Sequence, residues 1–233
     1  FATRHIVGDW DGYGYRRGKN QFAYKPKNGK WQMILWDLDF SLGANSDGPT
    51  ASLYSTSDPV ISRFYNTPGI RRQYLQIILE AVEGPLAPQI MGPVMEANAE
   101  ALRENRARVA NQVSQIGSWV ASRRSYLQKE VNRANQPFRI LTNGGQGFSA
   151  DANLLTLSGT APIEAYEIHV NGVPQKLRWL TESTWEADVL LASGENRLVI
   201  EGVDRFGAPL KTSRVVLPVV FNGESVPVED ALV

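Results

Sequence analysis

The side chains best suited to chemistry lie in the first forty residues of this 233-residue chain. Asp11 comes first, Lys19 and Asn20 follow as a pair, and Asp37 and Asp39 come directly after an apolar run. Carboxylate and amide oxygens are the ligands of hard cations such as Mg²⁺ and Ca²⁺. A lysine ammonium can neutralise a phosphate, although a solvated Lys19 is the alternative. These residue types fit a hard divalent ion better than they fit a soft metal.

Asp37 and Asp39 are separated by one residue. On an extended segment such side chains share a face, so Trp36 and Leu38 are expected to enter the core. Two adjacent carboxylates repel each other, and a cation, a basic partner or full solvation must offset the repulsion. The pattern therefore leaves two alternatives, a metal site or two carboxylates that simply face water.

The elements that position these residues can be read from the pattern around them. The glycine-rich run 8–14 predicts the end of a helix followed by a loop. Residues 21–25 and 30–36 are aromatic and apolar runs separated by a Pro-Lys-Asn-Gly turn signal. This arrangement predicts a β-hairpin between Asn20 and Asp37.

Residues 58–134 have the apolar spacing of helices. Asp58-Pro59 and Thr67-Pro68 are start signals, and Gly84-Pro85 ends the first long helix. Beyond Pro137, short alternating runs are separated by turns about every ten residues, which is typical of a β-sandwich. The sequence predicts an α+β chain with a mainly helical domain and hairpin over 1–136, an all-β sandwich over 137–221 and a tail or linker over 222–233.

Composition excludes several classes of function. The chain has 24 basic and 24 acidic side chains, which argues against a general binder of nucleic acid or of a membrane surface. Residues 1–136 hold 17 basic and 12 acidic side chains, and residues 137–233 hold 7 and 12. The absence of cysteine excludes disulfides and thiolate metal sites. His5 and His169 fall in different predicted domains, so neither a Ser-His-Asp site nor a His-rich metal site is expected, and His5 is expected to pack or cap beside the loop.

Four pieces of the sequence resemble the signature of the CotH kinase family, and residues 119–127 resemble the helix that closes its domain. The resemblance covers roughly residues 1–134 and implies the C-terminal lobe of an atypical protein-kinase fold. The four pieces are Asp11-Gly12-Tyr13, Lys19-Asn20, Gly29-Lys30-Trp31 and the run from Trp36 to Gly43.

This resemblance implies a role for each candidate residue. Protein kinases place a base Asp and a metal-binding Asn before a hairpin and a second metal-binding Asp after it. By resemblance, Asp11 orients or deprotonates the acceptor hydroxyl, while Asn20 and Asp37 hold the Mg²⁺ ions that bridge the phosphates of ATP. Asp39 is implied as a second-tier ligand, and Lys19 as a contact to the nucleotide.

The sequence also departs from the kinase pattern. Kinases place the Asn five residues after the Asp, whereas Asn20 follows Asp11 by nine, so residues 14–17 resemble an insertion. Leu35 stands where the family usually has proline. Nothing before Asp11 supplies a phosphate-covering loop or a nucleotide-binding lysine. We therefore expect that an N-terminal portion is missing and that this fragment alone does not turn over ATP.

Residues 162–172 and 185–200 resemble bacterial immunoglobulin-like modules, which implies a spacer. Tyr166, Trp179 and Trp185 are candidates for a sugar-stacking platform, and core packing is the alternative. The resemblance implies phosphate transfer from Mg-ATP to Ser/Thr of a surface or extracellular protein, and family habit implies an extracellular or cell-surface location. The alternative is a non-catalytic adhesion or scaffold module, in which the acidic loop binds Ca²⁺ structurally or binds no ligand.

Overall fold

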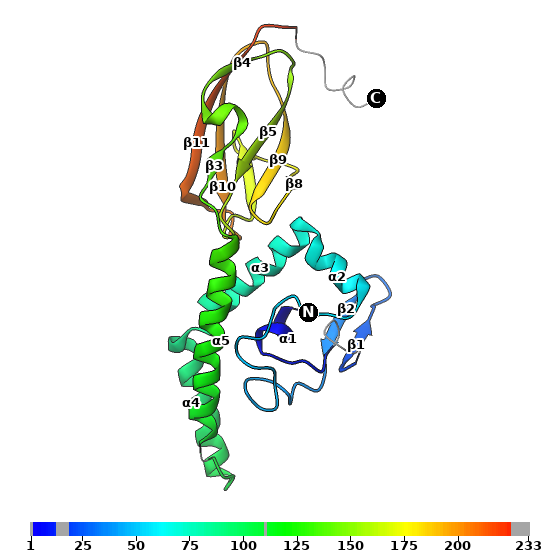
Figure 1. Cartoon of the computed structure of the whole chain (residues 1–233), viewed down its shortest axis with the longest axis vertical. Helices are drawn as coiled ribbons and strands as arrows, with labels where there is room; N and C mark the ends of the chain where they lie inside the picture. The colour runs from blue at the N-terminus through cyan, green and yellow to red at the C-terminus, as the bar shows by residue number, and fades with distance from the viewer. Residues whose placement is uncertain (1, 13–18, 110, 225–233) are drawn as a thin grey trace. The chain divides into compact units, whose positions relative to one another are not determined.

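A computed structural model describes residues 2–12, 19–109 and 111–224, apart from the side chain of Leu35. The chain is α+β and folds into two compact units, residues 1–133 and 134–233. The first unit runs from blue to green in Figure 1 and holds the helices and one hairpin, and the second runs from green to red and is built from strands. The predicted insertion at 14–17 and residues 225–233 of the predicted tail lie outside the described residues.

The chain begins with the short helix α1, Ala2–Ile6. After the helix, Gly8 has a φ of 74°, and its N–H donates a hydrogen bond to the carbonyl of His5 at 3.3 Å. The N–H of Asp9 then donates to the carbonyl of Arg4 at 2.8 Å. A Cβ on Gly8 would also lie 2.7 Å from the Trp119 ring, so glycine is required for both conformation and space. The predicted helix end is confirmed.

Strands β1 (Gln21–Tyr24) and β2 (Gln32–Leu35) form the predicted antiparallel hairpin. Gln21 pairs with Leu35 and Tyr24 with Gln32, and the turn closes with the Gly29 N–H donating to the Pro26 carbonyl at 3.1 Å. The described large side chains of both strands are exposed. The hairpin therefore gains little from burial in the described residues, and contacts at its base must hold it.

The prediction that Trp36 and Leu38 enter the core is wrong. The Trp36 side chain is 60% exposed and that of Leu38 is 37% exposed. Strand β2 ends at Leu35, and Asp37 has a φ of 58°, which is incompatible with an extended strand. The two-residue alternation therefore stops at the point where the prediction applied it.

Four helices follow: α2 (Pro59–Asn66), α3 (Pro68–Glu83), α4 (Pro88–Glu104) and α5 (Gln112–Ala134). The Asp58 carboxylate caps α2 by accepting the N–H groups of Val60 at 2.7 Å and Ile61 at 3.2 Å. Helix α3 ends just before Gly84. The predicted starts and this end are confirmed. The side chains from α2 and α3 that are fully buried are Ile61, Leu75, Ile78 and Val82.

Helix α5 fastens the N-terminal part of the first unit. The buried Arg123 guanidinium donates to the carbonyls of Ile6 at 3.2 Å, Pro49 at 3.1 Å and Ala51 at 2.8 Å, and also to that of His5. Because these carbonyls belong to α1 and to the loop near residue 50, one side chain holds three separate segments together.

The second unit consists of two sheets that share one core. The four-stranded sheet has the order β3-β5-β9-β8 and the five-stranded sheet the order β4-β11-β10-β6-β7. The first sheet comprises Arg139–Ile140, Leu154–Thr160, Thr184–Leu190 and Arg178–Trp179 in that order. The second comprises Phe148–Ala150, Pro209–Phe221, Gly194–Val203, Glu167–Val170 and Val173–Pro174, and a short 3₁₀ turn, η1, covers Thr142–Gly145.

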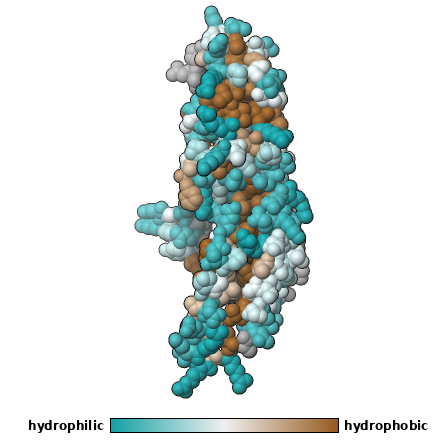
Figure 2. Space-filling model, turned by 90° about the vertical axis from the view of Figure 1, so that its left-hand side faces the viewer, coloured by the Kyte–Doolittle hydropathy of each residue, from teal (hydrophilic) through white to brown (hydrophobic). Residues whose placement is uncertain are grey.

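The core between these sheets contains Leu157, Trp185, Ile200 and Leu217, all buried. As predicted, Leu198 and Ile200 face inward. Figure 2 shows one face of the molecule, on which hydrophobic side chains reach the surface between larger hydrophilic areas. Among the described residues, no helix has the length and apolar character needed to cross a membrane.

Candidate functional site

The candidate site is built around Arg4, which is only 1% exposed. Its Nη1 pairs with the Asp9 carboxylate. Its Nη2 donates to the carbonyl of Asn20 and, at 2.8 Å, to the carbonyl of Trp36. One buried cation from α1 thus joins the loop after α1 to both ends of the β1–β2 hairpin.

Asp11 lies beside this cluster and is 5% exposed. Its N–H donates to Asp9 Oδ1 at 2.9 Å, which fixes the backbone at this position. Its Oδ2 accepts a hydrogen bond from Asn20 Nδ2 at 3.2 Å and lies 2.6 Å from Lys19 Nζ. The structure therefore brings together Asp11, Lys19 and Asn20, three of the residues singled out from the sequence.

Asp37 reaches the same place through the backbone. The Trp36 N–H donates to the Asn20 carbonyl at 3.2 Å, so Asp37 follows directly on a residue that is bonded to Asn20. Asn20 and Asp37 both have a left-handed backbone, with φ of 62° and 58°. Such a φ is uncommon for residues other than glycine, and Asn and Asp are among those that adopt it most readily.

Asp39 is not brought into this cluster. The Asp37 and Asp39 side chains are exposed, and no hydrogen bond or ion pair joins either of them to another described side chain. Asp37 therefore stands at the edge of the site with its carboxylate open to solvent, and Asp39 stands beyond it.

The oxygen donors at the hairpin base could contribute to a site for a divalent ion. Since Asn20 uses Nδ2 to bond Asp11, its amide oxygen is left for another partner. The described part of the chain contains no group of three acidic or histidine side chains that could hold a metal. Ca²⁺ takes six to eight oxygen ligands, whereas Mg²⁺ is commonly bound by one or two carboxylates together with substrate phosphates. Among the described residues, the donor set could hold a divalent ion only together with further ligands that are not protein side chains of this cluster.

Burial sets the ionisation of the groups around the cluster. It raises the pKa of the Asp9 carboxyl, although the Asp11 N–H and the Arg4 guanidinium act in the opposite direction. Burial also lowers the pKa of His5 to about 4. His5 Nδ1 lies 2.8 Å from the Tyr74 hydroxyl and 3.2 Å from the Leu53 carbonyl. His5 therefore packs in the core as a neutral residue, and of the two predicted alternatives, packing or capping beside the loop, it is packing that the structure shows.

Sequence reasoning missed Arg4 and did not single out Asp9 for a role. The available signal was an arginine inside an apolar segment, with Ala2, Ile6 and Val7 around it. A long cationic side chain in such a segment needs a partner if the segment is buried. Asp9, five residues later, was the nearest acidic residue in the sequence.

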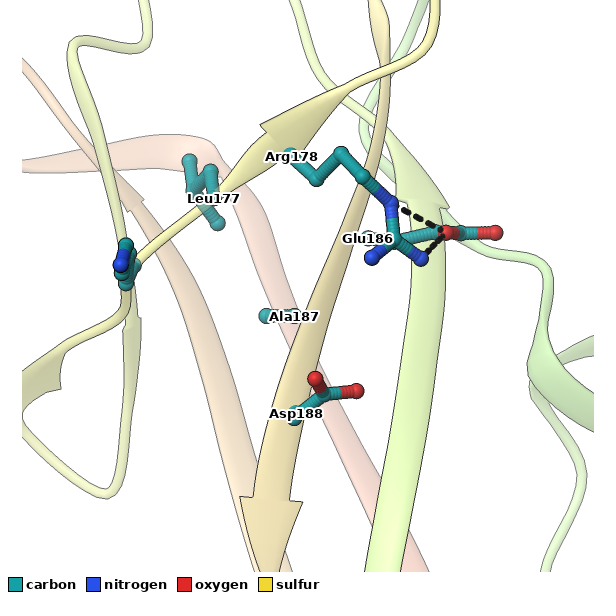
Figure 3. A pocket seen from close by; sticks show the side chains of 6 residues that line it. Leu177, Arg178, Glu186, Ala187 and Asp188 are labelled. Atoms are coloured by element: carbon teal, nitrogen blue, oxygen red, sulfur yellow. Dashed lines mark hydrogen bonds and ion pairs between the residues drawn. The ribbon is translucent and has the colours of Figure 1, made fainter. Parts of the chain in front are cut away.

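The second unit has its own pocket of about 320 Å³, lined by residues 176–178 and 186–188. Figure 3 shows Arg178 bonded to Glu186 at its wall, with the Nε donating at 3.1 Å. None of the three aromatic residues proposed for sugar stacking lines it. Trp185 is fully buried in the core, which is the alternative given for it and excludes it from a stacking platform.

A buried carboxylate and an asparagine at the base of a hairpin, with a second carboxylate after it and helices beyond, follow the order of elements in protein kinases. The CotH kinase protein family matches residues 1–134, more than half of the chain, and the chain belongs to this family. Membership indicates a kinase-like function. A comparison with curated proteins finds no match.

Proposed function

We propose that residues 1–134 form the C-terminal part of a protein kinase domain that transfers phosphate from Mg-ATP to Ser/Thr of a surface or extracellular protein. The observation that carries this proposal is that Asn20 bonds Asp11 through its side chain, while one buried arginine binds the carbonyls of Asn20 and of Trp36, the residue before Asp37. Phosphoryl transfer is catalysed mainly by positioning and charge neutralisation. This cluster fixes both the carboxylate that would position the acceptor hydroxyl and the oxygen ligands that would hold the neutralising ion.

Each side chain of the cluster has a role that follows from its place. Asp11 is the buried carboxylate that orients the acceptor hydroxyl and takes its proton. Asn20 Oδ1 and the Asp37 carboxylate supply oxygen ligands on either side of the hairpin base. These two residues would hold Mg²⁺, which when bound would supply positive charge to neutralise the phosphates.

Lys19 connects Asp11 to the nucleotide. Its ammonium lies 2.6 Å from Asp11 Oδ2, while its side chain is 46% exposed and so has room to move. When a phosphate enters, the lysine can turn to it, because a phosphate offers more negative charge than one carboxylate. That movement frees Asp11 for the acceptor hydroxyl.

We propose that the second unit is an immunoglobulin-like spacer. Immunoglobulin sandwiches have a sheet of order A-B-E-D that faces a second sheet containing C, F and G. The order β3-β5-β9-β8 corresponds to the first, and β11-β10-β6 within the second sheet corresponds to G-F-C. A spacer of this kind supports the proposed extracellular or cell-surface location.

The experiment is phosphate transfer from γ-labelled ATP by the protein in its full natural length. Asp37→Ala should lower transfer by at least about a hundredfold, because it removes a charged ligand of the phosphate-bound ion. Asp151→Ala is the matched control, since it removes an exposed carboxylate from the second unit and should leave the rate unchanged. Undiminished transfer by the Asp37 variant would contradict the assignment of Asp37 as an ion ligand.

A second candidate is a non-catalytic adhesion or scaffold module. The ion pair between Lys19 and Asp11 favours it, because that contact neutralises the proposed base. In such a module Lys19→Met would cost stability alone, whereas in the kinase it should also weaken binding of Mg-ATP. A wild-type protein that neither binds Mg-ATP nor transfers phosphate would favour the scaffold.

A further inference from the structure

We infer that Arg4 is the positioning residue of this site, the group that fixes Asn20 and Asp37 relative to Asp11. The inference rests on the proposed function and assigns to a side chain of α1 the task of holding the two ion-binding residues in place. Arg4 would not touch the nucleotide or the acceptor and would act only through the groups it binds.

The hairpin is weakly buried. Phe22, Tyr24, Met33 and Ile34 are each at least 50% exposed, so packing within the described residues does not fix where the hairpin lies. Polar contacts at its base have to do so. Beside the Gln21–Leu35 strand pair and the contact between the Phe22 and Trp36 rings, three hydrogen bonds join the two ends: one from the Trp36 N–H to the Asn20 carbonyl and two from Arg4 Nη2.

The two carbonyls that Arg4 binds belong to one proposed ion ligand, Asn20, and to Trp36, the residue before the other proposed ligand, Asp37. One is the carbonyl of Asn20 itself, and the other is that of Trp36, which forms the peptide bond to Asp37. Both Asn20 and Asp37 have the left-handed backbone described above. A cation on the carbonyl at each position holds that conformation, and with it the direction of the side chain that would bind the ion.

Arg4 Nη1 connects the hairpin to Asp11, the proposed proton acceptor. Nη1 pairs with Asp9, and Asp9 Oδ1 accepts the N–H of Asp11. Two nitrogens of one guanidinium thereby connect the loop of Asp11 with both hairpin ends. A lysine has a single nitrogen and cannot reproduce this fork.

Gly12 supplies independent support for this role. A Cβ built on Gly12 would lie 2.3 Å from Arg4 Cδ and 2.5 Å from Arg4 Nη1. Because Arg4 is buried and both of its Nη nitrogens are bonded, a displacement of its side chain would break those bonds. The residue directly after Asp11 must therefore be small for the guanidinium to occupy its place.

The test uses two variants, Arg4→Lys and Gly12→Ala, each with a readout that needs no catalysis. In the metal-free protein, hydrogen exchange of the Trp36 amide should become about tenfold faster in both variants, because the hairpin base opens more often. Affinity for Mn²⁺-ADP should fall about 10- to 100-fold, the range found when an outer partner of a metal ligand is removed. Arg72→Lys, a buried arginine of α3, is the matched control and should change neither quantity.

The outcomes separate this inference from the proposed function. A folded Arg4→Lys protein with wild-type exchange at Trp36 would overturn the positioning role. If the Arg4 variant does not fold, exchange at Trp36 in Gly12→Ala decides the same question. This variant keeps the Arg4 charge and only displaces the Arg4 side chain. A wild-type protein that does not bind Mn²⁺-ADP would refute the proposed function, while the exchange measurement would still decide the role of Arg4.

Discussion

At the scale of single residues, burial controls the ionisation of the first unit. His5 lies among Tyr65, Tyr74 and the Leu53 carbonyl, and a proton on it would be a buried charge. Its pKa of about 4 in the folded protein lies below its ordinary value of 6.5. The stability linked to this difference is complete above pH 6.5 and is lost as the pH falls towards 4.

This linkage predicts an acid-sensitive first unit. The depressed pKa of His5 corresponds to about 3 kcal/mol of unfolding free energy lost between pH 7 and pH 4. Denaturant unfolding of the wild type and of His5→Gln at both pH values measures it, since the wild type should lose about that much more than the variant. His169→Gln, in the second unit, is the control. Equal pH dependence in the wild type and His5→Gln would contradict the burial of a neutral His5.

The scale of single residues also shows why sequence reasoning found Asp11 and Asn20 but not Arg4. Asp11 and Asn20 have the residue types and the order of a phosphotransferase loop, and these are visible in the sequence. Arg4 owes its role to partners 16 and 32 residues away, and no local pattern encodes those contacts. Trp36 and Leu38 were wrongly placed in the core because one left-handed residue, Asp37, ends the alternation.

At the scale of elements, turn and cap signals were sufficient to predict the local structure. The Asn28-Gly29 turn, the Asp58 cap and the Pro68 helix start are all where the sequence placed them. What the sequence could not predict is how α5 fastens the elements before it. Those contacts join residues more than 70 positions apart, and they depend on a tertiary arrangement that propensities do not contain.

Arg123 provides the test at this scale. Arg123→Met would remove a donor from four buried or partly buried carbonyls, of which only that of His5 keeps another, the Gly8 N–H, among the contacts described; we expect a loss of about 3 kcal/mol or more in unfolding free energy. Chemical denaturation followed by circular dichroism measures the loss. Arg103→Met in α4, which breaks only an exposed pair with Glu96, should change stability by about 0.5 kcal/mol or less. Similar losses in the two variants would show that α5 does not hold the unit through Arg123.

At the scale of the whole molecule, the chain has two units with separate cores. Trp185 is fully buried in the second core, and its replacement by alanine should cost about 3–5 kcal/mol. Phe206, 78% exposed in the same unit, should tolerate alanine within about 0.5 kcal/mol. Calorimetry should show two transitions, of which Trp185→Ala lowers one. A single transition that shifts as a whole would mean that the units unfold together.

The account depends most on Asp11, because its burial and its contacts with Lys19 and Asn20 make it the proposed base. The direct measurement is single-turnover phosphate transfer from γ-labelled ATP by Asp11→Asn, together with the affinity for Mg-ATP. Asparagine keeps the shape but cannot take a proton, so transfer should fall about 10²- to 10⁴-fold while Mg-ATP still binds. Wild-type transfer by Asp11→Asn would contradict the assignment of Asp11 as the catalytic base.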